Sequence, residues 1–119
     1  MEIQTIKKRR DFLKGNGEAY TVMNSVIIQS YLRSEDSNEA DNSIKLGITC
    51  SKKIGNAVLR NKAKRRLREA GKMILSKIGK KNRNYILIAR KDITLTTKFC
   101  ALCKDIEDGI KKIYSSEKA

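Results

Sequence analysis

SKKIGNAVLRNKAKRRLREAGK, residues 51–72, holds the densest positive charge of the chain and predicts a long helix. Nine basic residues stand against one acid, Glu69, so this stretch contributes +8 of the chain's net charge of +14. Apolar residues recur within and beyond it at steps of three or four, the spacing of one helix face; they are Leu59, Ala63, Leu67, Ala70, Ile74 and Ile78.

The opposite side of this helix should be cationic. At about 100° per residue, it carries Arg60, Asn61, Lys64, Arg65, Arg68 and Lys72. A merely solvated helix face usually mixes acids and bases four residues apart. Because this face has almost no acids, the pattern favours a rigid surface that binds a polyanion.

Length and composition set the class of protein. The 119 residues suit one domain, expected over 1–119, with a modest core. A pI near 9.9 points to nucleic acid or an anionic membrane as the partner. We expect no membrane association, since no apolar run approaches the ~20 residues of a spanning helix. The N-terminus also lacks a signal-peptide pattern.

The reactive side chains argue against catalysis by the protein. The chain has no His, which excludes imidazole acid–base chemistry and Ser/His or Cys/His nucleophiles. Three cysteines without a secretory signal indicate free thiols and a cytoplasmic location. Cys100 and Cys103 form a lone CxxC within a helical pattern, so we expect small buried residues and no metal site. No catalytic residue is assigned.

The rest of the chain predicts a small sheet covered by helices, an α/β (α+β) two-layer sandwich. Asn56 is the expected N-cap of the basic helix, and Gly71 should bend or fray that helix. The general rule for strand–helix–strand units would make the crossover right-handed. The expected elements are a helix at 5–14, strands at 20–32, 44–50 and 85–89, a mobile acidic loop at 33–43, a helix at about 96–114 and a frayed tail at 115–119.

Residues 51–70 resemble the protein subunit of bacterial ribonuclease P. The family carries Gly-x-x-x-Ser-Lys-Lys, then Gly-Asn-Ala-Val and an Arg-Asn-Arg box. Gly47, Ser51–Lys53, Gly55–Val58 and Arg60–Asn61 match these motifs, while Lys62 replaces the last Arg of the box. The resemblance extends to the KKRRDF start and to YILIAR, which ends at Arg90.

The resemblance implies a mixed sheet with a left-handed crossover, against the general rule, and a catalytic centre in a partner RNA that works with Mg²⁺. It implies no protein partner. The residues implied to bind the RNA subunit are Lys52, Lys53, Asn56, Arg60, Asn61, Lys64, Arg65 and Arg68. The 5′ leader of precursor tRNA would lie between the sheet and the first helix, at Phe12, Gln29 and Asn16, of which the last two depart from the family's aromatic residues.

Two other classes remain open from the residues alone. A ribosomal-type structural protein could use the same basic helix to bind RNA, and a membrane-surface protein would bind anionic vesicles. The aromatic residues Tyr20, Tyr31 and Tyr85 could stack on bases of a single strand, although each is more typical of core packing.

Overall fold

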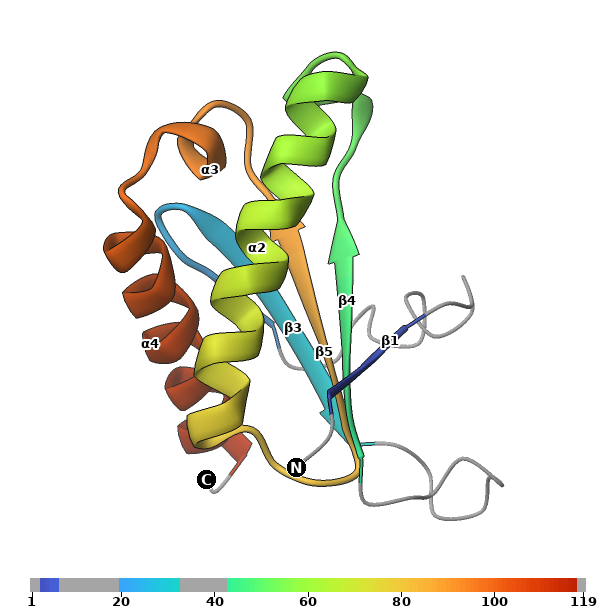
Figure 1. Ribbon diagram of the computed structural model, residues 1–119. Coiled ribbons are helices and arrows are strands. Elements are labelled where there is room, and N and C mark those ends of the chain that lie inside the picture. Colours follow the sequence, from blue (N-terminus) through green and yellow to red (C-terminus); the bar gives the residue numbers. More distant parts are fainter. Residues whose placement is uncertain (1–2, 7–19, 33–42, 118–119) are drawn as a thin grey trace.

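The computed structural model describes residues 3–6, 20–32 and 43–117, which form a five-stranded sheet with helices on one face (Figure 1). The elements are β1 (Ile3–Thr5), β2 (Tyr20–Val22), β3 (Val26–Leu32), β4 (Ile44–Thr49), a 3₁₀ helix (Lys52–Ile54), α2 (Ala57–Ile78), β5 (Arg83–Ala89), α3 (Ile93–Thr96) and α4 (Phe99–Glu117).

The sheet is mixed, which confirms the predicted fold class. Its strand order is β1-β4-β5-β3-β2. Both β1 and β5 run parallel to β4, whereas β3 is antiparallel to β5 and β2 to β3. In Figure 1, α2 lies in front of the sheet, and β5 lies to the left of β4 with both strands pointing upward. This is a left-handed crossover, as the family resemblance implies and against the general rule.

The core lies between the sheet and the pair α2 and α4. The apolar stripe of α2 is buried from Ala63 to Ile74, as predicted. Leu59 is the exception, at 39% exposed, because it belongs to the first turn and packs beside Gly55. The predicted face of α4 is also confirmed, since Leu102, Ile106, Ile110 and Ile113 are buried with Phe99 and Cys103 packed against them.

Gly71 serves close packing rather than a helix end. The helix continues through it to Ile78, so the expected fraying is wrong. A Cβ added at Gly71 would lie 2.9 Å from Leu87 Cδ1 and 3.1 Å from Leu46 Cδ2. The absent side chain lets the α2 backbone approach β4 and β5 closely, which offsets the ~1 kcal/mol that Gly costs in a helix interior.

The stretch 20–32 forms two strands, β2 and β3, instead of the one predicted. Distant side chains hold the turn between them. Asp105 Oδ2 accepts hydrogen bonds from Ser25 N–H at 3.1 Å and from its hydroxyl at 2.6 Å. The Arg90 guanidinium donates to Met23 O at 2.7 Å and Asn24 O at 3.2 Å. Because these partners lie more than 60 residues away, the local pattern could not reveal the turn.

The remaining boundaries differ by a few residues. Thr5 lies in β1, paired with Leu46, where the helix 5–14 was expected to begin, and the N–H of Ile6 donates to Leu46 O at 3.0 Å, so neither residue is helical. Residues 7–14 are outside the described residues. The loop 33–43 is outside them too, except Ser43. The strand at 85–89 begins earlier, at Arg83. The helix expected at about 96–114 is α4, Phe99–Glu117, and the short helix α3 before it was not predicted. Residues 115–117 are helical.

Candidate nucleic-acid interface

A tight turn joins β4 to the basic helix and fixes where α2 begins. Gly55 has φ +139°, a conformation that side chains rarely adopt, and a Cβ there would lie 2.7 Å from Leu59 Cδ1. Asn56 is the N-cap, as predicted, because its Oδ1 accepts a hydrogen bond from Leu59 N–H at 3.0 Å. The turn therefore holds Lys52 and Lys53, both exposed on the 3₁₀ helix, next to the first turn of α2.

The predicted cationic side of α2 faces away from the core. Asn61, Arg65, Arg68 and Lys72 are exposed, whereas Arg60 and Lys64 are half-buried. In the described part of the chain, none of the five cations in this set has a carboxylate within ion-pairing distance; the ion pair seen there on α4, Lys111 with Glu107, measures 3.9 Å. We call this set, together with Lys52 and Lys53, the α2 cationic surface. Its charge is available for phosphates.

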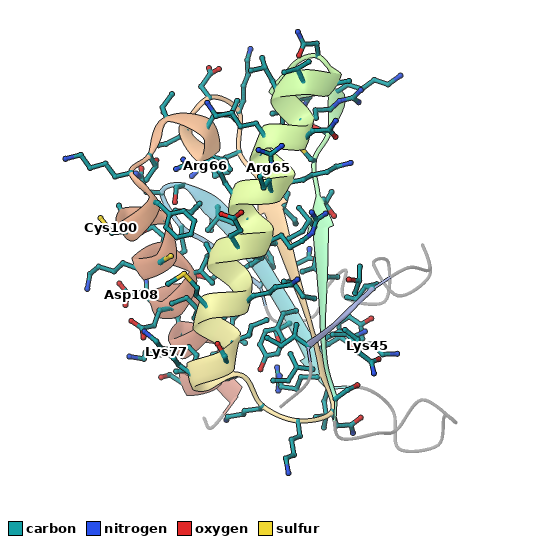
Figure 2. All side chains as sticks on the ribbon, viewed as in Figure 1. Lys45, Arg65, Arg66, Lys77, Cys100 and Asp108 are labelled. Atoms are coloured by element: carbon teal, nitrogen blue, oxygen red, sulfur yellow. The ribbon has the colours of Figure 1, made fainter. Side chains whose placement is uncertain are left out.

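Arg66 has a structural role, which the sequence pattern did not reveal. Its Nε donates to Thr94 O at 3.2 Å and its guanidinium also donates to Thr97 O, so it ties α2 to α3. Figure 2 shows Arg66 on the side of α2 near α3 and Arg65 on the outer face. Adjacent arginines thus have different functions, because successive residues of an α-helix are rotated by about 100° and so point to different sides of it.

We expect Arg66→Met to lower the free energy of unfolding by about 1.5–3 kcal/mol, the usual loss for a hydrogen bond to a charged group. Arg65→Met removes the same charge from the exposed face and should change stability by less than about 0.5 kcal/mol. Urea denaturation of both variants measures the difference. Equal losses would mean that the contacts from α2 to α3 contribute nothing specific.

The sheet face opposite the helices holds a second apolar cluster of Ile6, Tyr31 and Ile86, with Ile88 packed against it. Alternation along β3 puts Gln29 on this face, since Val26 and Ile28 belong to the core beneath the helices. We call it the open sheet face because none of the described helices lies on it, although Ile6, Tyr31 and Ile86 are each at most 8% exposed. Gln29 is half-buried there, while Phe12 and Asn16 lie outside the described residues.

The tyrosines divide between core and surface. Tyr85 is fully buried and Tyr31 is 8% exposed, with its hydroxyl accepting from Asn84 Nδ2 at 2.8 Å. Tyr20 is 59% exposed and pairs with Gln29 across the ladder between β2 and β3. The expectation of core packing is therefore confirmed for two tyrosines and wrong for Tyr20, because β2 is the edge strand of the described sheet and Tyr20 shares the face of Gln29, away from α4.

The cysteines do not form a reactive or metal-binding group in the described residues. Both Cys100 and Cys103 were expected to be buried, but Cys103 is only half-buried and Cys100 is exposed, because Cys100 lies outside the apolar face of α4. Burial raises the pKa of the Cys103 thiol, and the neighbouring Cys100 raises it further. Burial also raises the pKa of Cys50 against the opposing charges of Lys64 and Arg60. Within this part of the chain, no three His, Cys, Asp or Glu side chains could hold a metal ion.

The fold and these surfaces define a class: a small basic α+β protein that presents a rigid cationic helix beside an open sheet face. Among the described residues, no helix is long and apolar enough to cross a membrane. The family model described as Ribonuclease P matches residues 2–114. This chain belongs to the ribonuclease P protein family.

Similar proteins agree with this assignment. The Ribonuclease P protein component of Ruegeria pomeroyi is 40% identical over 113 residues, covering 95% of this chain and 88% of the relative. The Ribonuclease P protein component of Mycoplasma capricolum is 36% identical, and the match covers 92% of this chain and 95% of the relative. The solved RNase P protein of Staphylococcus aureus has a TM-score of 0.70 at 30% identity, and the match covers 90% of this chain and 92% of that protein. The Thermotoga maritima protein, at 23% identity, shares the fold with a TM-score of 0.73.

Proposed function

We propose that this protein is the non-catalytic subunit of ribonuclease P, binding the RNA subunit and the 5′ leader of precursor tRNA during Mg²⁺-dependent removal of that leader. The observation that supports this most directly is the α2 cationic surface, held on a capped helix in a chain of this family, with no described carboxylate within ion-pairing distance of its α2 cations. The ribosomal-type alternative is not favoured, because the family match covers nearly the whole chain.

The RNA subunit should contact the α2 cationic surface. Arg60, Arg65 and Arg68 offer planar donor forks for phosphate, whereas Lys52, Lys53 and Lys64 offer point charges. Asn61 is exposed and can hydrogen-bond a base edge. The Oδ1 of Asn56 is occupied by the helix cap, so Asn56 contributes mainly by fixing the turn that presents the other residues.

Catalysis is assigned to the RNA. The chain has no His, and the acids of the described residues form no metal-binding group. Mg²⁺ would be held mainly by RNA phosphates, whose oxygens suit this hard cation. The chain's own part is to bring cationic side chains near two polyanions and so reduce the repulsion between them. We place this work in the cytoplasm, where free thiols stay reduced.

The leader should lie on the open sheet face. Gln29 cannot stack on a base as an aromatic ring does, but Tyr20 lies directly opposite it in the ladder, with more than half of its surface exposed. Side chains in such a pair have Cβ atoms about 4.5–5.5 Å apart. Tyr20 can therefore supply a stacking ring beside position 29. The other two residues expected to bind the leader, Phe12 and Asn16, are outside the described residues.

We expect Tyr20→Ala to weaken holoenzyme binding to precursor tRNA by about 5- to 150-fold, since stacking of a base on an aromatic ring contributes about 1–3 kcal/mol. Tyr20→Phe keeps the ring and should retain affinity. Leu32→Ala removes another side chain that is 59% exposed and tests for a general surface effect. Binding of mature tRNA, which has no leader, should not change. If Tyr20→Ala weakens both RNAs equally, the ring does not contact the leader.

Sequencing the RNA that co-purifies with the tagged protein tests the proposed function as a whole. The RNase P RNA should be the main enriched species after washing at moderate salt. A bacterial lysate offers ribosomal RNA in large excess, so it serves as an internal competitor. Enrichment of ribosomal RNA in place of RNase P RNA would overturn the proposal and restore the structural alternative.

A further inference from the structure

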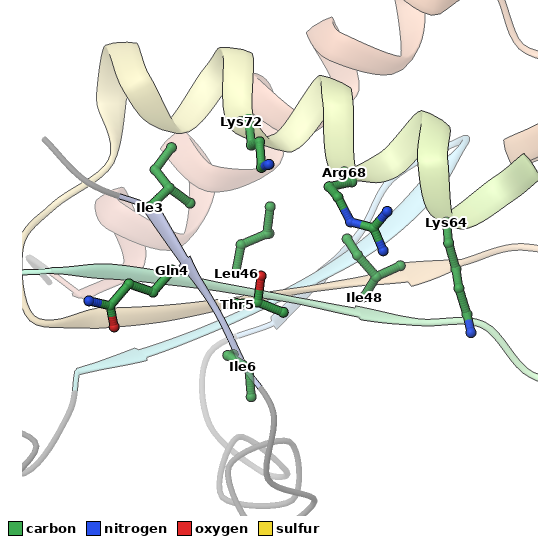
Figure 3. A pocket seen from close by; sticks show the side chains of 9 residues that line it. All are labelled: Ile3, Gln4, Thr5, Ile6, Leu46, Ile48, Lys64, Arg68 and Lys72. Carbon is green, nitrogen blue, oxygen red and sulfur yellow. The ribbon is translucent and has the colours of Figure 1, made fainter. Parts of the chain in front are cut away.

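A cavity lies between α2 and the edge of the sheet, where β1 pairs with β4. Figure 3 shows its lining, with Arg68 and Lys72 extending from α2 towards the strands. Its volume is about 140 Å³, roughly ten times the ~10–15 Å³ that one water molecule requires. The cavity is therefore large enough for a group bigger than a solvent molecule.

The lining of this cavity has two chemically different sides. On the helix side, Lys64, Arg68 and Lys72 repeat every four residues, about 6 Å apart along the axis. Like charges at this spacing destabilise a helix slightly. Among the described residues, no Asp or Glu lines the cavity, so no described side chain of its lining neutralises these charges. An anion would relieve their repulsion.

The strand side of the cavity is mainly apolar. Ile3 of β1 and Ile48 of β4 are both half-buried and border the space. Thr5 also lines it and is exposed; because Thr5 pairs with the core residue Leu46, its side chain lies on the same side of the sheet as α2. A ligand that matches the whole cavity must combine an apolar part with a negative charge.

We infer that this cavity binds one unstacked nucleotide of RNA, with its base against Ile3 and Ile48 and its phosphate at Arg68 and the flanking lysines. A bare phosphate would leave the apolar side uncovered, and an apolar molecule would leave three cations unpaired. Bases of single-stranded loops can be splayed out in this way, whereas those of a duplex cannot. The inference rests on the proposed function, which supplies RNA as the partner; either the RNA subunit or the precursor tRNA can provide the nucleotide.

Titration of the full-length protein with adenosine 5′-monophosphate tests the cavity directly. Adenosine and inorganic phosphate are the comparison ligands, and amide NMR shifts in β1, β4 and α2 are the readout. We expect the nucleotide to bind at least about tenfold more tightly than either part alone, because it uses both sides of the cavity. Equal binding of inorganic phosphate and nucleotide would overturn the inference.

A charge-matched pair of variants separates the cavity from the general charge of α2. Arg68→Gln removes a cavity cation and should weaken nucleotide binding by about 10- to 150-fold, the equivalent of one lost charge-assisted hydrogen bond of about 1.5–3 kcal/mol. Arg65 does not line the cavity, so Arg65→Gln should change nucleotide binding by less than about twofold. Equal effects of the two variants would show diffuse electrostatic attraction and contradict a defined site.

Closing the cavity without changing the charge gives an independent test. Thr5→Phe puts a ring into the space, and an aromatic residue suits a strand. It should abolish nucleotide binding, whereas Thr5→Val, which keeps the side-chain size, should retain it. The thermal midpoint of each variant reports folding. If folded Thr5→Phe protein still binds the nucleotide, the nucleotide binds outside this cavity and the inference is overturned. If the variant does not fold, the comparison of Arg68→Gln with Arg65→Gln tests the inference instead.

Crosslinking in the assembled holoenzyme identifies the source of the nucleotide. The unsubstituted complex with precursor tRNA is irradiated with short-wavelength ultraviolet light, and mass spectrometry identifies the nucleotide crosslinked to peptides of β1, β4 or α2. A crosslink to one nucleotide of the RNA subunit, or to one of the precursor, supports the inference and assigns the source. Crosslinks spread over many nucleotides would overturn it. The proposed function would still stand in that case, provided that Arg65→Gln weakens assembly with the RNA subunit.

Discussion

Replacing Arg60, Arg65 and Arg68 together by Gln is expected to lower affinity for RNase P RNA by about 100- to 500-fold at 0.1 M salt. Each cation that neutralises a phosphate contributes about 0.7–0.9 to the slope of log affinity against log salt, so three contacts amount to two to three decades at this concentration. The same variant should reduce the salt slope by two to three units. Filter binding at several salt concentrations measures both effects.

The matched control for this variant lies on another surface. Lys98, Lys104 and Lys112 are exposed at or near α4, so their joint replacement by Gln removes the same net charge away from α2. It should lower affinity far less, because only long-range attraction is lost. Neither triple variant should change the thermal midpoint by more than a few degrees. Equal losses of affinity in the two variants would mean that net charge alone drives binding.

The protein alone should cleave no precursor tRNA, and its stimulation of the RNA subunit should be largest at low Mg²⁺. Repulsion between two RNAs is screened by cations of either kind, so Mg²⁺ can partly replace the protein. We expect stimulation to fall progressively as Mg²⁺ rises towards the level at which the RNA works unaided. Single-turnover rates over a series of Mg²⁺ concentrations, with and without protein, give the curve.

The length of the leader provides the second axis of that experiment. A precursor with a leader of several nucleotides should gain more from the protein than one with a single nucleotide, since only the longer leader reaches the open sheet face. Tyr20→Ala should remove this difference while retaining the gain from the α2 cationic surface. Cleavage by nuclease-treated protein without RNA would contradict the mechanism, as would stimulation that depends on neither Mg²⁺ nor leader length.

The sequence predicted those features that depend on local periodicity and on single residues. The apolar stripe of α2, the N-cap at Asn56, the strand at 44–49 and the buried face of α4 were all readable, because each follows from the spacing of side chains along one element. The left-handed crossover came from family resemblance alone; the physical rule for such units gives the opposite hand.

The candidate site was predicted in part. The exposed positions of α2 follow from helix geometry, but the sequence could not separate Arg65 from Arg66, because the carbonyl partners of Arg66 come from α3, about 30 residues further along. Tyr20 was indistinguishable from the core tyrosines by pattern. Its exposure depends on its place in β2 at the edge of the sheet, which the strand order decides.

By itself the sequence determined that the chain is strongly basic, lacks His and has a helix that presents unneutralised charge, because net charge, composition and helical spacing belong to the residues themselves. Only the tertiary structure decided which charges are free, where the β2–β3 turn falls, and that β1 and α2 enclose a cavity. These features arise from contacts between distant segments: Asp105 and Arg90 fix the turn, and pairing of β1 with β4 puts Thr5 in the lining of the same cavity as Arg68.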